Sequence, residues 1–380
     1  MTESPSDSRL LDHHHPHLVP QIPIEIVSDE EMALLFARSL IPSTVRAFPS
    51  SVRSLQYSIT LLSKRSLWGC SQPGIEDSGW FNTTTQKKKA ESLLHRFRNK
   101  KGLSASDFAE SEWCEQQMRY ILLNGNRVIS KAMKTGRERH AKLEEEFVTK
   151  SKVVVNSDED KWALRFLKFI TGINQLYTEG LTRELPLVGF AEGIWMVGVI
   201  DEVQMPATET QRNPLLVDTK TRVKDKLPSE PQRRKGRLQL MFYKYLWDNL
   251  EASGFPADQF FDHFSLNPDC DLSEEIREVV RAKSGYPAKT LDDVVKYYRK
   301  SWILLPRAHD QLLLRYELQK HYSVIGEDIF AYDSDVFKKQ LQVCLEFWLG
   351  KREASYTPEE ERWKCYSCEF ASTCPAAPAN

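Results

Sequence analysis

A chain of 380 residues is long enough for one large domain or two ordinary ones, so a sizeable buried core can form. Its composition, 41% hydrophobic and 28% charged, is that of a globular protein, and no apolar run approaches the length needed to cross a bilayer, which excludes an integral membrane protein. The formal net charge is only -1, so any attraction to nucleic acid depends on how the cations are distributed.

The first 75 residues differ in composition from the rest of the chain. From Ala33 to Ile75 there is no acidic residue, while arginines and lysines are spaced among Ser, Leu and Ala, which is typical of an organelle transit peptide. The acidic segment 29–31 stands before it, so an unstructured tail is the alternative. We therefore expect a disordered tail or organelle-targeting segment at 1–75 and a folded domain at 76–380. Location in a chloroplast or mitochondrion, in the nucleus, or in both is expected.

Hydrophobic periodicity predicts the elements in chain order. It predicts helices at 107–123, 134–149 and 160–177, a β-hairpin at 185–205, a strand at 215–222, a cation-rich loop at 224–236 and a helix at 237–250. The remainder is expected to be mostly helical, with Thr290 and Asp293 as a capping pair and a final helix at 335–350 with Ser334 as its N-cap.

Three stretches are locally basic and could follow a phosphate backbone. They are 86–101 with seven cations, 131–142 with five and 220–237 with eight. The alternative for each is a solvated helix face or a loop.

The strand at 215–222 carries the first pair of residues that points to chemistry. Side chains alternate between the faces of a strand, so Asp218 and Lys220 project from the same side. Asp201 ends an otherwise apolar strand, where an ionised group is costly unless a cation or a hydrogen-bonding partner is present. Two acids and a lysine at a sheet edge are groups with which a nuclease holds Mg²⁺, acidifies a water and stabilises the departing oxyanion. A salt bridge between neighbouring strands is the alternative.

Two helices add polar residues to this set. His140 and Glu144 stand one turn apart and could offer an imidazole to the same metal, while Gln239 and Tyr243 are four residues apart on the helix after the Asp218 strand. Taken singly, a histidine such as His140 is more typical of a packed or capped residue, and the pair Gln239 and Tyr243 is more typical of a core. The nearby rings expected to stack on bases are Phe242, Tyr245 and Trp247.

The seven cysteines form a second constellation, because three of them are bunched as Cys365-x₂-Cys368-x₅-Cys374. The odd count, the absence of a secretory signal and the CxxC spacing favour thiolate coordination over disulfides. Spacing alone leaves Zn²⁺ and an iron-sulfur cluster open. With Cys114 as the fourth ligand, such a centre would tie the first core helix to the last segment of the chain.

Taken together, these motifs resemble eukaryotic exonuclease V, and the plant members of that family are the most similar. The segments that carry the resemblance are 103–108, 113–115, 136–140, 198–202, 218–222, 239–243 and the terminal CxxCx₅C. The resemblance covers about residue 76 to the C-terminus. It implies an α/β fold with a restriction-endonuclease-like PD-(D/E)XK core, a mixed central sheet flanked by helices, and N- and C-terminal parts joined by a 4Fe-4S cluster.

The resemblance also implies roles for individual residues. His140, Asp201 and Asp218 would hold Mg²⁺, with the Thr219 carbonyl as a further ligand, and Lys220 would act with the two aspartates as the catalytic lysine. Gln239 and Tyr243 match the family's Gln-x₃-Tyr motif and would support the active site and the substrate strand. The residues that match the 4Fe-4S ligands are Cys114, Cys365, Cys368 and Cys374. Many relatives carry Glu where this chain has Asp218, and the shorter side chain could shift the metal.

The function that the resemblance implies is Mg²⁺-dependent digestion of single-stranded DNA from its ends, with 5′ ends preferred, in DNA repair. The protein is expected to act as a monomer, away from membranes, with a single-strand-binding protein as a candidate partner. One alternative is a non-catalytic iron-sulfur DNA-binding or scaffold protein, and another is a structure-specific endonuclease on the same fold. Every motif position holds a chemically competent residue, which favours an enzyme.

Overall fold

A six-stranded mixed sheet lies at the centre of the computed structural model, which describes residues 91–125, 129–145, 153–206 and 212–378. The strands are β1 (Leu103–Ser104), β2 (Leu181–Ala191), β3 (Ile194–Gln204), β4 (Leu215–Arg222), β5 (Gln311–Leu318) and β6 (Val324–Ala331). Their order is β1-β3-β4-β5-β6, and β2 pairs with β3. β1 with β3 and β4 with β5 are parallel pairs, and the other pairs are antiparallel. The described residues belong to one unit, Lys87–Asn380.

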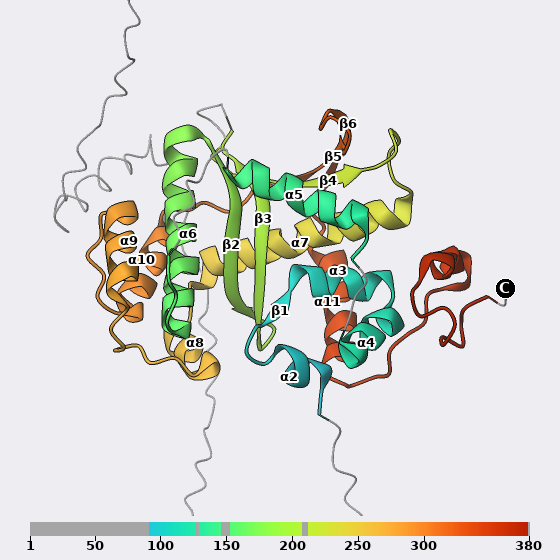
Figure 1. Cartoon of the computed structure of the whole chain (residues 1–380), viewed down its shortest axis with the longest axis horizontal. Helices are drawn as coiled ribbons and strands as arrows, with labels where there is room; N and C mark the ends of the chain where they lie inside the picture. Colours follow the sequence, from blue (N-terminus) through green and yellow to red (C-terminus); the bar gives the residue numbers. More distant parts are fainter. Residues whose placement is uncertain (1–90, 126–128, 146–152, 207–211, 379–380) are drawn as a thin grey trace, which may run out of the picture. The chain divides into compact units, whose positions relative to one another are not determined.

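Helices flank this sheet, as predicted (Figure 1). They are α2 (Leu93–Arg98), α3 (Ala105–Trp113), α4 (Glu115–Asn124), α5 (Lys131–Glu145), α6 (Asp158–Glu179), α7 (Glu230–Ser253), α8 (Ala257–Phe264), α9 (Glu274–Ser284), α10 (Leu291–Ile303), α11 (Ser334–Trp348) and the 3₁₀ helix η1 (Glu359–Ser367). The long helix α7 packs against β2, β3, β4 and β5, while α6 packs against β2 and is covered by α9 and α10. α5 contacts β2 and β4. None of these helices is long and apolar enough to span a membrane.

One edge of β3 is interrupted, and this gap positions the candidate site. β2 pairs along nearly the whole of one edge of β3. On the other edge, β1 pairs only with Met196 and Val197, and β4 pairs only from Glu202 onward. Within the described residues, positions 198–201 therefore have no strand beside them on that edge. Beyond Val217, β4 continues with β5 as its partner, so the sheet forks between β3 and β4.

Several predicted elements are confirmed and two helix boundaries are corrected. The hairpin, the strand 215–222 and the helix predicted at 160–177 are present as β2–β3, β4 and α6. The single helix predicted at 107–123 is wrong, because the chain is extended at Cys114 (φ -170, ψ 114), which ends α3 and caps α4. The helix predicted to start at 237 begins at Glu230 with a proline in its first turn, so the predicted loop was too long.

The C-terminal third also differs from the prediction. It contains β5 and β6, which the expectation of a mostly helical remainder missed. The capping box of Thr290 and Asp293 is confirmed at α10. α11 is capped by Asp333 and not by Ser334, because the Asp333 carboxylate accepts hydrogen bonds from the backbone N–H groups of Asp335 and Val336. The end of the helix predicted at 134–149 and the whole of 1–75 lie outside the described residues.

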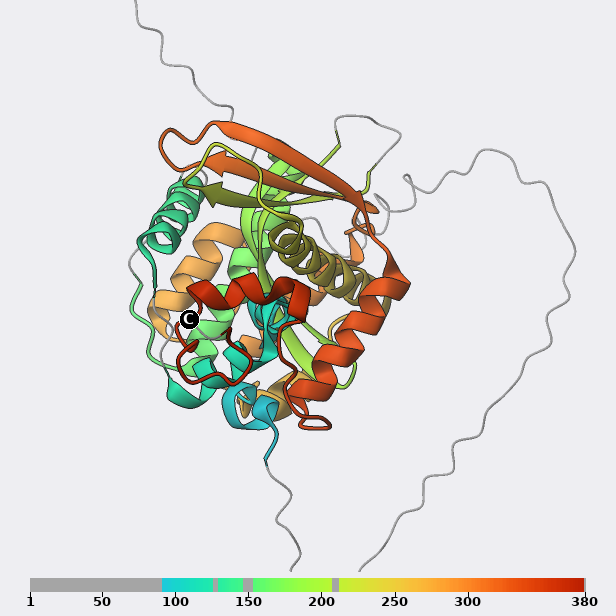
Figure 2. The same cartoon turned by 90° about the vertical axis from the view of Figure 1, so that its right-hand side faces the viewer.

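The last part of the chain runs beside α3 and α4 (Figure 2). The buried carboxylate of Glu115 accepts hydrogen bonds from the Arg352 guanidinium, at 2.5 and 2.6 Å, and from the backbone N–H and the hydroxyl of Ser355, at 2.8 and 2.7 Å. The Gln116 amide donates to the carbonyl of Ala354. The C-terminal segment is thus fastened to the first turn of α4.

Candidate active site

Asp218 and Lys220 project from the same face of β4, as the strand alternation predicts. Asp218 is fully buried, and the Lys220 ammonium donates a hydrogen bond of 2.9 Å to its Oδ1. The other oxygen, Oδ2, accepts no hydrogen bond although Lys220 Nζ lies 2.8 Å from it. The Lys220 ammonium thus pairs with both oxygens of the Asp218 carboxylate and offsets part of the cost of burying it.

The side chain of Asp201 reaches from β3 to β4 at the fork between these strands. Its Oδ2 accepts a hydrogen bond of 2.9 Å from the backbone N–H of Thr219, which brings its carboxylate next to Asp218. Burial and then the charge of Asp218 raise the pKa of Asp201 to about 8. Two neighbouring carboxylates that resist ionising together are typical of a site that holds a divalent cation.

A chain of hydrogen bonds leads from Lys220 to α7. The Gln239 side-chain oxygen accepts from Lys220 Nζ at 3.0 Å, and its amide nitrogen donates to Tyr243 Oη at 2.9 Å. Burial lowers the pKa of Lys220, but the charges of Asp218 and Asp201 outweigh it and raise the pKa. Tyr243 is only 3% exposed. The structure thus brings the predicted pair Gln239 and Tyr243 to the lysine.

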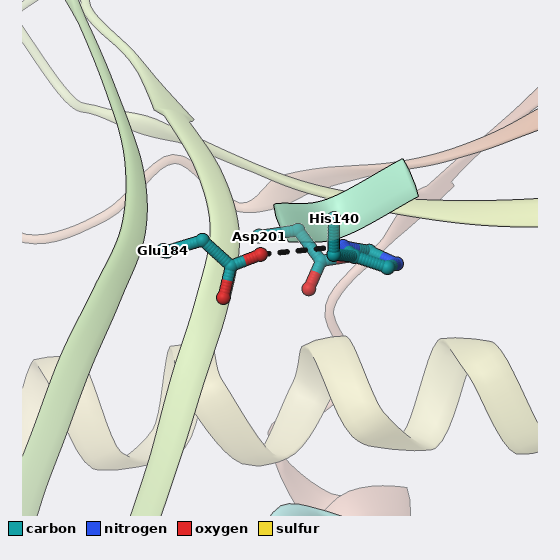
Figure 3. Close-up of side chains that lie close together, drawn as sticks. All are labelled: His140, Glu184 and Asp201. Carbon is teal, nitrogen blue, oxygen red and sulfur yellow. Dashed lines mark hydrogen bonds and ion pairs between the residues drawn. The ribbon is translucent and has the colours of Figure 1, made fainter. Parts of the chain in front are cut away.

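His140 on α5 lies beside Asp201, and Glu184, which the sequence reasoning missed, lies close to both (Figure 3). His140 Nδ1 lies 3.3 Å from Glu184 Oε1 on β2 and 3.7 Å from Asp201 Oδ2. One donor atom from each of the three residues lies within 4.8 Å of the others. Burial alone would lower the pKa of His140, but the hydrogen bond with Glu184 and the charges of Asp201 and Glu184 raise it to about 9.

The missed residue Glu184 could have been found from the hairpin register. Arg183 pairs with Glu202 and Leu185 pairs with Ile200, so Glu184 falls opposite Asp201. The side chain of Glu144, the other acid considered on α5, lies outside the described side chains.

The prediction that rings on α7 stack on bases is wrong, because these rings are part of the core. Phe242 and Trp247 are fully buried and Tyr245 is 8% exposed. Phe242 packs against Phe108, and Trp247 packs against Trp302.

The three basic stretches differ in how many of their charges are paired. On α5, the side chains of Lys131, Lys134 and Arg137 are exposed to solvent. In the stretch 220–237, Arg234 and Arg237 form ion pairs with acidic residues. Lys224 and Lys226 of the same stretch are exposed, and Arg98 of the stretch 86–101 pairs with Asp107.

Four cysteines from distant parts of the sequence line one small cavity. They are Cys114, Cys365, Cys368 and Cys374. Cys114 caps α4, and its sulfur accepts from the backbone N–H of Gln117. Burial, followed by the neighbouring cysteines, raises the pKa of Cys365. Cys344 is a buried residue of α11, and neither it nor Cys270 lines this cavity. Cys70 lies outside the described residues.

The spacing of these thiols is wider than that of ligands on one ion. Within the part of the chain that the structure describes, no three cysteines form a cluster like that of His140, Glu184 and Asp201, whose donor atoms lie within 4.8 Å of one another. Thiolates bound to one tetrahedral zinc at about 2.3 Å would stand about 3.8 Å apart.

Comparison with known proteins identifies one family. The model of a family described as "Exonuclease V - a 5′ deoxyribonuclease" matches residues 92–214, 204–302 and 289–375. A zebrafish (Danio rerio) protein named Exonuclease V is 30% identical over 291 residues, which are 74% of this chain and 72% of the relative. A Candida dubliniensis protein named "Exonuclease V, mitochondrial" is 34% identical over 71 residues, 19% of this chain and 11% of that relative.

Proposed function

This chain belongs to the exonuclease V family, and from this premise we propose that it hydrolyses single-stranded DNA from its 5′ ends. The observation that carries the proposal is the pair of adjacent carboxylates, Asp201 and Asp218, that meets Lys220 at the fork between β3 and β4. Membership of this family indicates the class of reaction, hydrolysis of DNA, and the site supplies residues that can carry it out.

We further propose that the forked sheet is a PD-(D/E)XK core and that its cation is Mg²⁺. The residues fit such an ion, because the carboxylates of Asp201 and Asp218 adjoin each other, and burial followed by the charge of Asp218 raises the pKa of Asp201. Asp201, Asp218 and His140 would hold the cation, with the Thr219 carbonyl as a further ligand. When bound, the cation would lower the pKa of a coordinated water and offset the charge on the leaving oxygen.

Lys220 and its hydrogen-bond partners would act on the attacking water and on the phosphate. Asp218 and Gln239 hold the ammonium from two sides, so that it can orient the attacking water and face the phosphate charge. The water gives up a proton as its oxygen forms the new bond to phosphorus, the bond to the leaving oxygen breaks, and that oxygen takes up a proton. Because Tyr243 is buried and bonded to Gln239, we propose that this pair supports the substrate strand by positioning Lys220.

The four cysteines Cys114, Cys365, Cys368 and Cys374 are proposed to bind a 4Fe-4S cluster. The cavity that they line supports a shared centre, and four cysteine thiolates are the usual ligands of a 4Fe-4S cluster. The cluster would join α4 to the C-terminal segment. Its role would be structural, since hydrolysis needs no electron transfer.

The test is an assay of end dependence. Full-length protein with Mg²⁺ is given linear single strands labelled at the 5′ or the 3′ end, a linear duplex and circular single strands, with Lys220→Ala as the inactive control. We expect the linear single strand to be shortened from its 5′ end while the circle stays intact. Cutting of the circle at a similar rate would establish an endonuclease, and an equal rate on the duplex would refute single-strand specificity.

A role in DNA repair and a location in an organelle, the nucleus or both are also proposed. The Candida relative is named mitochondrial, and 33–75 has the composition of a transit peptide. A fluorescent fusion of residues 1–90 should enter the organelle, and a fusion that stays in the cytosol would refute targeting by this segment.

A further inference from the structure

Gln319, the residue that follows β5, holds three segments of the chain together at the end of β4. Its backbone N–H donates to the carbonyl of Arg222 at 2.7 Å, and its side-chain amide donates to Thr221 Oγ1 at 3.0 Å. The same amide donates to the carbonyl of Ala132, in the first turn of α5, at 2.8 Å. The start of α5, the end of β4 and the turn between β5 and β6 therefore lie side by side (Figure 2).

Each of these three segments carries exposed lysines. They are Lys131 and Lys134 on α5, Lys224 and Lys226 after β4, and Lys320 after Gln319, and together they are called the basic ridge below. Within the ranges that the structure describes, none of the five forms an ion pair with an acid. Glu138 and Asp225 are the exposed acids of the same segments, so cations outnumber acids on this surface.

The basic ridge adjoins the candidate active site. Arg222, which Gln319 contacts, is two residues after Lys220 on β4, and a strand rises about 3.3 Å per residue, so the two lie about 7 Å apart along the strand. Gly136 of α5 lies so close to β4 that a methyl group there would be 3.2 Å from Thr221 Oγ1. A DNA strand bound at Lys220 can therefore continue directly onto the ridge.

The chemistry of the basic ridge fits a single strand of DNA. A lysine that meets a phosphate releases condensed counterions, so lysines without acidic partners attract a phosphate backbone. Val223 stands beside Lys224 and is 68% exposed, and an apolar side chain among cations can contact bases that no complementary strand keeps paired. A nuclease that works from an end releases short pieces, so the retained strand alone is long enough to meet lysines from three segments.

We propose that the basic ridge binds the backbone of the DNA strand that is retained after each cut, next to the scissile phosphate. This inference rests on the proposed nuclease function and adds to it a location for the substrate strand. The ridge holds the strand equally before and during the chemical step, so it contributes to affinity and KM, and kcat is left nearly unchanged.

The test uses full-length protein that carries Lys131→Gln, Lys224→Gln and Lys320→Gln together, one change in each segment. Fluorescence anisotropy without divalent cations measures the Kd for a labelled single strand of about 30 nucleotides at several salt concentrations. Each lysine that contacts a phosphate of a single strand contributes about 0.7 to the slope of log Kd against log salt. The triple variant should therefore lose about 2 from this slope and bind about 100-fold more weakly at about 0.1 M salt. With Mg²⁺, KM should rise while kcat changes less than about twofold.

The matched control carries Lys300→Gln, Lys338→Gln and Lys351→Gln. These lysines are exposed on α10, on α11 and after α11, and their replacement changes the net charge by the same amount. Because salt screens distant charges, the control should bind within about threefold of wild type. Melting temperatures establish that both triple variants fold. If the ridge variant does not, its three single variants are measured, and each should lose about 0.7 from the slope.

An unchanged slope in the ridge variant would overturn the inference and leave the ridge to another ligand, such as an acidic protein segment. An equal loss in the control would also overturn it, because net charge alone would then explain the effect. Binding is measured without cleavage, so the two proposals fail separately. A wild type that binds through the ridge without cutting would refute the nuclease function alone, while an active wild type with an unaffected ridge variant would refute the ridge alone.

Discussion

Tyr243 lies directly against Gly198, so closely that a methyl group at Gly198 would overlap the tyrosine ring. The glycine lies in the part of β3 that has no strand on one edge, three residues before Asp201. Its missing side chain lets the ring approach the sheet and place its hydroxyl on Gln239, which in turn holds Lys220. A backbone feature of β3 thus sets the position of the lysine on β4.

Gly198→Ala is expected to destabilise the protein by about 1–3 kcal/mol, because the added methyl must displace a buried ring, and to slow cleavage. Denaturant unfolding and single-strand cleavage measure the two effects. The loss of stability should shrink in a Tyr243→Leu background, where no ring is present, and persist in Tyr243→Phe. Equal losses in both backgrounds would mean that the overlap is not the cause.

Lys220→Ala and Asp218→Ala are expected to lower the cleavage rate by orders of magnitude, since both residues serve the attacking water or the cation. Affinity for single strands should change little, because binding depends on other cations. Single-turnover cleavage and fluorescence anisotropy measure the two quantities. Near-normal turnover by both variants would show that the site is elsewhere.

Gln239→Leu removes the oxygen that accepts from Lys220, so kcat should fall by about 10–100-fold with KM nearly unchanged. Tyr243→Phe keeps the ring and removes only the hydroxyl that orients Gln239, and a smaller fall in kcat is expected. Steady-state kinetics on a labelled single strand separates the two parameters. A rise in KM at constant kcat would instead assign Gln239 a direct contact with substrate.

Cys114→Ala is expected to lose iron, stability and cleavage together. Protein purified without oxygen should be brown and hold about four irons per chain. Cys270→Ala and Cys344→Ala are the controls and should keep the iron, because neither residue lines the cavity of the four cysteines. One zinc and no iron in the wild type, or full iron in Cys114→Ala, would contradict this ligand set.

Glu115→Ala should destabilise the protein by about 3 kcal/mol, because it leaves Arg352 and Ser355 without their shared acceptor. The control is Arg119→Ala on the same helix, whose ion pair with Glu353 is 3.5 Å long and exposed, and which should cost less than about 1 kcal/mol. Chemical denaturation measures both changes. Similar losses in the two variants would show that burial of Glu115 has no special effect.

The elements that the sequence predicted correctly are those with local signals. The hairpin has glycines and β-branched residues, and the alternation of β4 was enough to place Asp218 beside Lys220. β5 was missed because its first half is buried on both faces and lacks alternation: residues 312–314 are three consecutive buried leucines. Such a run is indistinguishable by periodicity from a buried helix segment.

Features missed at the site depend on contacts between distant segments. Glu184 and His140 are 44 positions apart in the sequence and meet because α5 packs against β2. The break at Cys114 was hidden because its neighbours have helical periodicity. Its extended conformation accompanies contacts of Glu115 and Gln116 with a segment more than 230 positions later in the chain.

This separation has a consequence for biosynthesis. Glu115 and Arg352 are 237 positions apart, so at about 5–20 residues per second the ribosome releases α4 roughly 10–50 s before the partner of its first turn exists. Until then the Glu115 carboxylate must stay hydrated, and of the four cysteines that line the cavity only Cys114 has been made. A chain that terminates before residue 352 lacks Arg352 and three of the four cysteines. Its helix α4 would stay without these contacts and accessible to proteases. Only a completely translated chain can therefore form the contacts between α4 and the C-terminal segment.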